Sequence, residues 1–453
     1  MRSITKSAFV AIGVTSLAVA QAPSTGAQNS VASDPGAAPT AGQAAELEYF
    51  KAAYGFSDHR AAVAIEREAA AESLLDKVGT LVRSSAWGGA WIDHSAGSTV
   101  HVGVTTSDAQ KTLAALRLPD YVVVDQVRFS IDELRKQRDE FRAAVVQELV
   151  KRAEETSQDS TRDLVAEAIS GGWAANVYVD RNMVEIRVPK GSPLSAAAQA
   201  TKVADGRFEA VRVESVEGDI SSRNSSSSTC ADQIGDCFPL EAGIQIYGAN
   251  GGGAYCTTGF TFIRSGTRYS STASHCAGTP WKHHGHDIGP TAWTLEAHTV
   301  DAKMVSITDP NAWKATNLVF RPASSDIRVT SKISNPDNSL QGITVCQVGV
   351  GKANQGFNPI SCGAVTSIDG QSGSWKNPDW DQMGVATYRD CSGDSGGPVF
   401  NNSTGRAYGL VRGKVGSAPF PVCTVGGRGG YESQFTWVSN IESASGYQVL
   451  LAE

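Results

Sequence analysis

The chain lacks several features that would mark other classes of protein. Its first 229 residues contain no cysteine, and it has neither a block of basic residues nor an apolar run of membrane-spanning length. Since 39 Lys and Arg stand against 46 Asp and Glu, the formal net charge is −7, and we expect no nucleic-acid partner and no membrane partner. The hydrophobic content of 41%, with 46 glycines, excludes collagenous, coiled-coil and wholly disordered proteins.

The first residues have the pattern of a secretory signal peptide. Arg2 and Lys6 precede an apolar run from Ala8 to Ala20, which ends in the small residues that a signal peptidase requires. A membrane anchor is the alternative, but a helix of this length rises only about 20 Å and does not cross a bilayer core. We therefore expect cleavage after about residue 20 and a secreted, extracellular product.

The cysteines that are present, eight in all, lie in residues 230–453. In the oxidising compartment that an exported protein meets, an even number of cysteines predicts four disulfides. At about 150 residues per domain, the length predicts two or three domains. The uneven distribution of cysteine indicates two halves that are built differently.

Composition divides the chain into segments. The predicted order is a signal peptide at 1–20, a flexible tether at 21–43, an α+β domain at 44–218, a linker at 219–229 and an all-β domain at 230–453. The tether has too little apolar bulk for a core. The linker contains a polar run of serines, where a protease finds exposed and flexible backbone, so we predict cleavage near its start.

Periodicity distinguishes the two predicted domains. Apolar residues recur at helical spacing in Ala44–Leu81 and Ser130–Ser170. Two β-hairpins are predicted over 90–104 and 176–188, and each follows a Gly-Gly pair beside a Trp, which suggests a degenerate duplication. The second domain has short strands between Gly, Ser and Asn turns, typical of a β-sandwich or barrel, and helical spacing returns only around Val438–Ala444.

A serine nucleophile is indicated by Gly393-Asp394-Ser395-Gly396-Gly397-Pro398. A hydroxyl nucleophile needs backbone amides directed at the developing oxyanion, and this glycine pattern lets the amides of Gly393 and Ser395 converge. The alternative is a glycine-rich surface turn, which is common in β proteins.

The base and the acid that such a serine requires occur earlier in the chain. His275 follows a predicted strand and precedes Cys276, whose disulfide would hold the imidazole in place. Asp301, which leads into an apolar strand, is the preferred acid to orient it. Asp287 competes for this role, but its neighbours His283-His284-Gly285-His286 indicate a solvated loop rather than an acid site or a metal site.

The order His, Asp, Ser, with Ala-Ser-His-Cys and Gly-Asp-Ser-Gly-Gly-Pro, resembles the chymotrypsin-like (trypsin-family) serine proteases. Within them it resembles the secreted bacterial branch typified by streptogrisins and α-lytic protease, over about residues 239–450. The resemblance implies an all-β catalytic domain of two six-stranded barrels with the active site between them. It also implies that residues 44–218 are a pro-region, a folding aid and inhibitor that is removed by cleavage.

The resemblance assigns roles to individual residues. Ser395 would attack the scissile carbonyl, His275 would move the proton, and Asp301 would orient the imidazole and stabilise its cation. The amides of Gly393 and Ser395 would form the oxyanion hole. The implied disulfides are Cys256 with Cys276, Cys346 with Cys362, Cys391 with Cys423, and the remaining Cys230 with Cys237.

Two positions depart from the family pattern. The carboxylate beside the nucleophile, Asp394, usually pairs with an arginine at the position where this chain has Gln347. Its counter-ion is therefore open among Lys352, Arg389 and Arg412. Arg412 itself replaces a serine usually found near the triad acid, where it could perturb the acid or line the substrate cleft.

The predicted substrate pocket contains Arg389, Asp390, Arg412 and Gly413. A lone aspartate at its base would favour Lys or Arg substrates, whereas a lone arginine would favour acidic ones. Together the two charges could neutralise each other, so the substrate preference is open.

These patterns predict a secreted serine endopeptidase made as a preproenzyme, which hydrolyses peptide bonds through an acyl-enzyme. We expect a monomer that acts on proteins or peptides and binds its own pro-region, without a cofactor or metal. One alternative is a catalytically silent relative that binds peptides or a protein partner, motivated by Gln347 and Arg412. Another is a secreted inhibitor or binding domain in the N-terminal half.

Overall fold

The structure, a computed structural model, describes most of the chain beyond residue 43. The described residues are 44–155, 173–204, 206–216, 233, 240–249, 255–310, 313–321, 326–373, 378–415 and 432–452. The predicted signal peptide, tether and linker lie outside them, as do Cys230, Cys237 and Cys423. Within these ranges, no helix combines the length and the apolar character needed to cross a membrane.

Five α-helices and a 3₁₀-helix are described in the N-terminal part, residues 44–216. They are α1 (Ala44–Tyr54), α2 (Asp58–Val78), α3 (Ser107–Ala114), α4 (Ile131–Glu155), α6 (Pro193–Ala204) and η1 (Ser84–Ala86). The helical spacing over Ala44–Leu81 is confirmed as two helices, α1 and α2, because the chain breaks between them. Gly55 has a φ of 67° there, and Ser57 starts α2 by accepting the backbone amide of Arg60.

Six strands accompany these helices and confirm both predicted hairpins. They are β1 (Trp87–Asp93), β2 (Thr99–Val104), β3 (Val122–Gln126), β4 (Ala174–Tyr178), β5 (Met183–Pro189) and β6 (Val211–Val216). In each half of this part an antiparallel hairpin is followed by a helix and a third strand parallel to the second. The order β1-β2-α3-β3 thus recurs as β4-β5-α6-β6, in agreement with the suggested duplication.

A closed ring of six strands lies within residues 344–437. Its members are β20 (Thr344–Val348), β21 (Ile360–Gly373), β22 (Pro378–Ala386), β23 (Pro398–Phe400), β24 (Arg406–Val415) and β25 (Glu432–Trp437). Hydrogen bonding follows the order β20-β23-β24-β25-β22-β21, and the pairing of β20 with β21 closes it. Buried Leu410, Phe435 and Trp437 belong to its core. Helix α8 (Val438–Ser445) follows the ring and confirms the helix predicted there.

The strands between residue 240 and the ring form three further sheets. Those strands are β7 (Leu240–Ala242), β8 (Gln245–Gly248), β9 (Tyr255–Thr257), β10 (Phe262–Arg264), β11 (Thr267–Thr272), β12 (Trp281–His283), β13 (His286–Gly289), β14 (Thr291–Ala297), β15 (Val300–Ser306), β16 (Ala315–Val319) and β17 (Ile327–Arg328). The largest has the order β14-β15-β11-β10-β26, where β26 is Gln448–Val449. The described residues of this half are therefore mostly β, as predicted. The six strands of residues 344–437 form one closed ring, whereas the preceding strands are divided among three sheets.

Four short elements lie between the strands of residues 327–360. They are β18 (Ser331–Lys332), η2 (Pro336–Asn338), β19 (Leu340–Gln341) and α7 (Val350–Asn354). β19 pairs with β1, and β18 pairs with β24.

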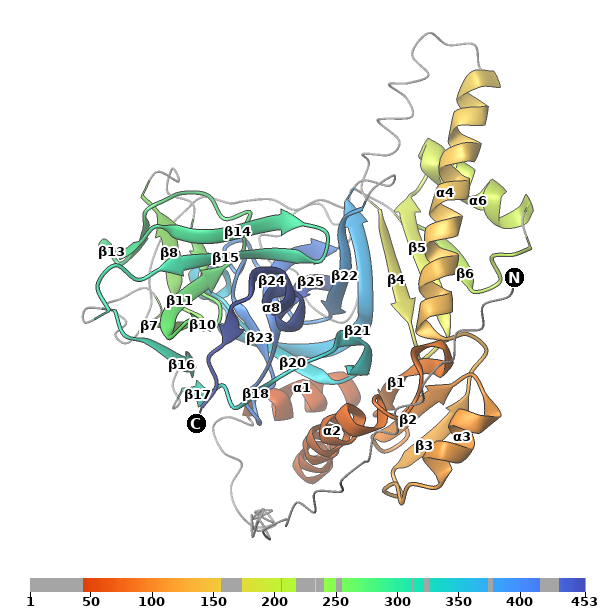
Figure 1. Cartoon of the computed structure of the whole chain (residues 1–453), viewed down its shortest axis with the longest axis horizontal. Coiled ribbons are helices and arrows are strands. Elements are labelled where there is room, and N and C mark those ends of the chain that lie inside the picture. The colour runs from red at the N-terminus through yellow and green to blue at the C-terminus, as the bar shows by residue number, and fades with distance from the viewer. Residues whose placement is uncertain are drawn as a thin grey trace, which may run out of the picture. The chain divides into compact units, whose positions relative to one another are not determined.

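One sheet runs from the ring into the N-terminal part. β21 pairs antiparallel with β4, so that β4, β5 and β6 extend the sheet of the ring, and α4 runs along this extension (Figure 1). From α4, Arg138 Nη1 donates to Asp369 Oδ1 of β21 at 2.7 Å, and Arg135 contacts the other carboxylate oxygen. Burial raises the pKa of Asp369, but the charges of Arg138 and Arg135 outweigh this effect and lower the pKa to about 2.

Candidate active site

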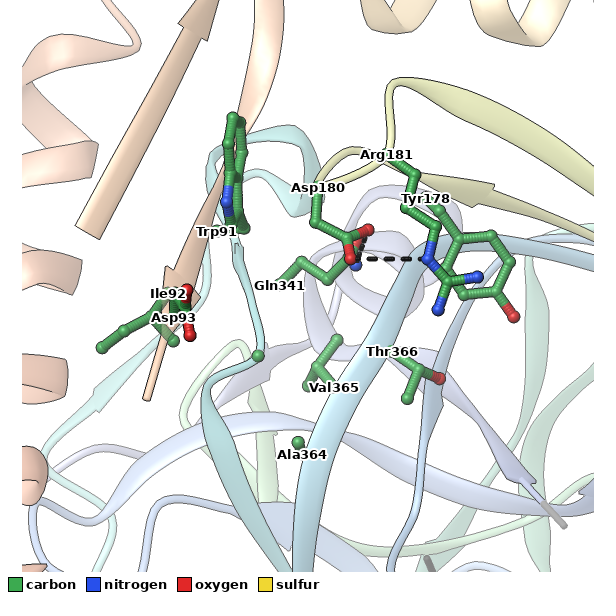
Figure 2. A pocket seen from close by; sticks show the side chains of 11 residues that line it. Trp91, Ile92, Asp93, Tyr178, Asp180, Arg181, Gln341, Ala364, Val365 and Thr366 are labelled. Carbon is green, nitrogen blue, oxygen red and sulfur yellow. Dashed lines mark hydrogen bonds and ion pairs between the residues drawn. The ribbon is translucent and has the colours of Figure 1, made fainter. Parts of the chain in front are cut away.

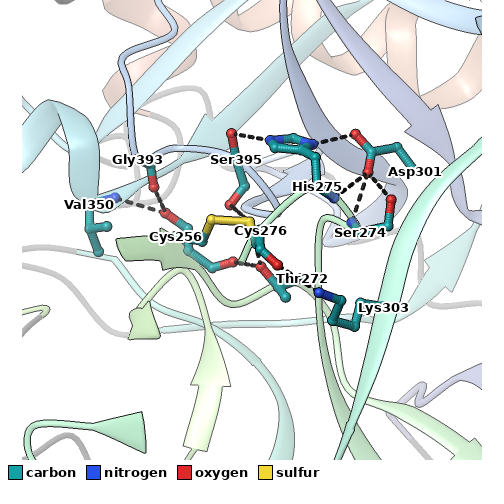
Figure 3. Close-up of a disulfide and its surroundings, with 11 residues drawn as sticks. Cys256, Thr272, Ser274, His275, Cys276, Asp301, Lys303, Val350, Gly393 and Ser395 are labelled. Atoms are coloured by element: carbon teal, nitrogen blue, oxygen red, sulfur yellow. Dashed lines mark hydrogen bonds and ion pairs between the residues drawn. A yellow bond between two sulfur atoms is a disulfide. The ribbon is translucent and has the colours of Figure 1, made fainter. Parts of the chain in front are cut away.

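His275, Asp301 and Ser395 meet although they lie far apart in the sequence. His275 follows β11 and Asp301 lies at the start of β15, and these strands pair antiparallel with Thr272 opposite Lys303. His275 Nδ1 lies 2.7 Å from Asp301 Oδ2, and His275 Nε2 lies 2.9 Å from Ser395 Oγ (Figure 3). Both distances are within hydrogen-bond reach, so a hydroxyl, a base and a carboxylate form one continuous chain.

The carboxylate of Asp301 is fully buried and receives four hydrogen bonds. Besides His275 Nδ1, its donors are the backbone amide of Ser274 at 2.7 Å, the Ser274 hydroxyl at 2.6 Å and the backbone amide of His275 at 3.3 Å. Burial raises the pKa of Asp301, but the charge and hydrogen bond of His275, together with Arg412 and Ser274, lower it below its ordinary value. Asp301 is therefore held in the ionised form.

A disulfide holds the loop that carries the histidine. Cys256 of β9 and Cys276 are joined with an S–S distance of 1.98 Å. Lys303 Nζ donates to the carbonyl of Cys276 at 2.6 Å, and burial lowers the pKa of this lysine. The backbone directly after His275 is thus fixed at Cys276 (Figure 3).

The other cysteines agree with the pairing that the resemblance implies, as far as they are described. Cys346 and Cys362 join the neighbouring strands β20 and β21. Cys391 is also disulfide-bonded.

The turn before Ser395 requires glycine at position 393. Gly393 has a φ of 99°, and a Cβ atom there would lie 2.3 Å from the ring of Tyr255. Its carbonyl accepts a hydrogen bond from Thr257 Oγ1 at 2.7 Å. Among the described residues, no hydrogen bond engages the backbone amides of Gly393 and Ser395, so both remain available as donors.

Lys352 is the counter-ion of Asp394. Its Nζ lies 2.9 Å from Asp394 Oδ2, and neither side chain is exposed. The amides of Lys352 and Cys391 also donate to this carboxylate, at 3.1 and 2.8 Å. Gly349 makes room for the contact, because a Cβ there would lie 2.1 Å from Asp394 Oδ1. One of the three candidates left open by the sequence thus supplies the missing cation, from α7.

The four residues of the predicted substrate pocket lie in different surroundings. Arg389 stacks on the ring of Phe357, with its guanidinium carbon 4.1 Å from the ring centroid, whereas Asp390 is buried. Arg412 stacks on Trp380 at 4.2 Å and donates to Gln434 Oε1 at 3.2 Å. Gly413 lies opposite Gln434 in the pairing of β24 with β25.

The competing acid and the histidine run are placed elsewhere. Asp287 forms an exposed ion pair with Lys282 at 2.7 Å. His283 Nδ1 lies 2.6 Å from the carbonyl oxygen of Gln245, in the pairing region of β8 and β12. Within the described ranges, no three His, Cys, Asp or Glu residues are grouped as metal ligands.

Sequence reasoning missed three residues around the site. Ser274 precedes His275 directly, so its hydroxyl was a local signal, and Lys303 lies two residues after Asp301 in one strand, where alternation places both on one face. Thr257 offered no signal, because its partner Gly393 lies 136 positions away in the sequence. Such contacts depend on which strands meet.

A cavity of about 460 Å³ lies between the N-terminal part and the ring. Trp91, Asp93, Tyr178, Arg181 and Thr366 are among its lining residues (Figure 2). It includes none of His275, Asp301 and Ser395, so it is separate from the candidate active site.

Comparison with solved structures finds partial similarity to chymotrypsin-like bacterial serine proteases. A glutamic acid-specific serine protease that uses a histidine triad in substrate binding is 23% identical, over 47% of this chain and 100% of that chain, with a TM-score of 0.37. Thermobifida fusca protease A is 21% identical over 47% and 100% of the two chains, and Nocardiopsis protease 20% identical over 47% and 98%, both with TM-scores of 0.36. No protein-family model and no curated protein matches the sequence.

Proposed function

We propose that the chain is a secreted serine endopeptidase made as a preproenzyme. The observation that carries this proposal is the unbroken contact from Ser395 Oγ to His275 Nε2, at 2.9 Å, and from His275 Nδ1 to the buried Asp301, at 2.7 Å. A hydroxyl is a weak nucleophile unless a base within hydrogen-bond reach removes its proton. The arrangement supplies this base and a carboxylate that orients it.

Each residue then has a defined step in peptide hydrolysis. Ser395 Oγ attacks the scissile carbonyl while His275 Nε2 takes its proton, and the amides of Gly393 and Ser395 donate to the oxyanion. His275 returns the proton to the leaving amine, which leaves an acyl-enzyme. A water molecule activated by His275 then hydrolyses the acyl-enzyme, while Asp301 stays ionised and stabilises the imidazolium.

The N-terminal part is proposed to act as a folding aid and then as an inhibitor. The pairing of β4 with β21 supports this role, because it adds strands to residues 369–372 of β21, beyond the part of β21 that pairs with β20. The ion pairs of Arg135 and Arg138 with Asp369 join the same two parts. A segment that binds the ring in this way favours the folded ring over the unfolded chain.

The purified secreted protein should react with a fluorophosphonate probe for activated serines. We expect label on Ser395, in a chain that begins near residue 220, when label and N-terminus are mapped by mass spectrometry. Covalent reaction requires the activated hydroxyl and not merely the fold. A folded and processed chain without label would overturn the proposal and favour a silent peptide-binding relative.

Expression of residues 221–453 alone is expected to yield little active enzyme. Co-expression of residues 21–220 as a separate chain should restore the activity, because the contacts of β4 and α4 with the ring are then available in trans. The measurement is the yield of fluorophosphonate-labelled enzyme. Efficient folding of the isolated C-terminal half would contradict the folding role while leaving the proposed hydrolysis intact.

Replacing Ser274 by alanine should move the acidic limb of the pH profile of kcat/KM by about 0.5 to 1 pH unit toward higher pH. The variant removes one of the hydrogen bonds that lower the pKa of Asp301, so this pKa rises and the carboxylate orients the imidazole only at higher pH. The readout is kcat/KM on a peptide substrate across pH.

Ser271→Ala is the matched control for this prediction. Ser271 is a fully buried serine of β11, but its hydroxyl donates to the carbonyl of Phe260 at 2.7 Å and not to Asp301. We expect Ser271→Ala to lower stability without moving the pH profile. Equal shifts in both variants would show that the Ser274 hydroxyl has only a structural role.

A further inference from the structure

Three glutamates of the first two helices are buried where these helices contact the ring. Glu46 lies on α1, and Glu68 and Glu72 lie on α2, with 0%, 1% and 5% of their surface exposed. Ionised carboxylates are very rarely buried unless each is paired with a cation. The burial of three glutamate side chains at one contact therefore requires an explanation of how their charge is compensated or removed.

Glu46 contacts the turn at residues 402–404. Its Oε1 accepts the backbone amides of Asn402, at 2.8 Å, and Ser403, at 3.2 Å, and its other oxygen contacts the Ser403 hydroxyl. The charged groups that act on it are the carboxylate of Glu68 and the guanidinium of Arg321. None of the three direct donors carries a charge.

Glu72 contacts β24. Its carboxylate accepts the hydroxyl of Tyr408 and lies 3.7 Å from Arg406 Nε. Arg406 also pairs with Asp76 of the same helix at 3.2 Å, so a single cation serves two carboxylates. Glu68 adds a further negative charge to the surroundings of Glu72.

Glu68 interacts electrostatically with both of the other glutamates. It accepts the amide and the hydroxyl of Thr344 in β20, both at 3.0 Å, and lies 3.0 Å from His94 Nε2. Tyr49 and Tyr54 of α1 and Tyr408 of β24 also interact electrostatically with it.

We propose that α1 and α2 bind the ring in an acid-dependent manner, with Glu46 and Glu72 entering the contact as neutral carboxylic acids. The surface that contacts Glu46, Glu68 and Glu72 consists of the 402–404 turn, Thr344, Arg406 and Tyr408. The contact is then strong at acidic pH and weakens as the pH rises through neutrality. This consequence rests on the function proposed above. In a preproenzyme, a rise in pH would favour release of the N-terminal part.

The direction of the pH dependence follows from burial. Burial raises the pKa of Glu46 to about 8 and that of Glu72 to about 7, against an ordinary value of 4.5. The contact keeps its full strength below the ordinary value, where both groups are protonated with or without the contact. It weakens as the pH rises above that value, until each group is ionised within the contact, at about pH 7 for Glu72 and about pH 8 for Glu46.

A second contact between the same parts provides an internal reference. Asp369 is ionised at every pH well above 2, because Arg135 and Arg138 lower its pKa to about that value. The stability that this group contributes is present above the ordinary pKa of an aspartate and is lost only as the pH falls toward 2. Between about pH 5 and pH 8 this contact is therefore constant.

Hydrogen exchange of the full-length Ser395→Ala chain tests the proposal. After correction for intrinsic exchange rates, protection of the α1 and α2 amides should fall about tenfold or more between about pH 5 and pH 8. Protection of the first turns of α4, beside Asp369, should change by less than about threefold. Glu46→Gln combined with Glu72→Gln should keep α1 and α2 protected at the higher pH, because glutamine stays neutral.

Glu48→Gln is the control, since Glu48 lies on α1 with 74% of its side chain exposed, and it should retain the original pH dependence. A double variant with the original pH dependence, or no dependence in the parent chain, would refute the proposal. If the double variant does not fold, infrared spectroscopy of the Glu241→Gln chain decides, because burial raises the pKa of Glu241 to about 8 as well and its band must be removed. The carbonyl band of neutral carboxylic acids must be present at about pH 6 and absent at about pH 9. Neither measurement requires hydrolysis, so a failure here is distinct from a failure to label Ser395.

Discussion

Ser395→Ala should lower the rate of peptide hydrolysis by about 10⁴- to 10⁶-fold. The variant removes the only atom that attacks the substrate in the proposed mechanism, while His275, Asp301 and the amides of Gly393 and Ser395 stay in place. The remaining activity would come from binding and from the oxyanion donors. The measurement is kcat/KM on a peptide substrate, together with loss of fluorophosphonate labelling.

Ser331→Ala is a suitable control for this experiment. Ser331 lies in β18, which pairs with β24, and it has no role in the proposed mechanism. We expect it to retain both activity and labelling. Hydrolysis by Ser395→Ala at the rate of the parent enzyme would refute the assignment of the nucleophile.

Lys352→Met should be strongly destabilising, by about 3–5 kcal/mol in the free energy of unfolding. The variant leaves the carboxylate of Asp394 buried without its cation, because Lys352 Nζ lies 2.9 Å away and neither side chain is exposed. Asp394 accepts the amides of Cys391 and Lys352 and precedes Ser395, so the turn that presents the nucleophile would loosen and kcat would also fall. Denaturant unfolding in the Ser395→Ala background measures the first effect.

Two further variants distinguish the effect of leaving a buried carboxylate without its cation from the effect of replacing any lysine. Lys282→Met removes the cation of an exposed pair with Asp287 and should leave the unfolding midpoint almost unchanged. Lys352→Met combined with Asp394→Asn removes both charges and should be less destabilising than Lys352→Met alone. If Lys352→Met unfolded at the midpoint of the parent chain, Asp394 would not depend on this lysine.

Prediction from the sequence succeeded where neighbouring residues carry the signal. The hairpin β1–β2 has alternating apolar residues around a Gly-containing turn, and helix α8 has helical spacing after a β run. Asp301 was preferred over Asp287 because it leads into an apolar strand, and Asp301 is the acid that contacts His275.

Prediction failed or stayed open where the partner is distant in the sequence. Sequence alone left three cations for Asp394, because Lys352 reaches it across 42 positions. Glu46 and Glu72 have the spacing of solvated residues on amphipathic helices, and nothing near them in the sequence indicates that β24 and the 402–404 turn cover them. The helical spacing over Ala44–Leu81 does not indicate the break at Gly55, because glycine within a helical pattern does not always end the helix.

The chemistry available to this chain is already contained in its local sequence. A serine between glycines, a histidine beside a cysteine and an aspartate at the start of a strand retain their chemical character in any fold, because reactivity begins with side-chain type and adjacent backbone. Which groups pair, and in which protonation state, depends on the strands and helices that meet in space. The contacts of Lys352 with Asp394, of Ser274 with Asp301 and of α1 and α2 with the ring exist only in the folded chain, where burial makes each charge depend on its neighbours.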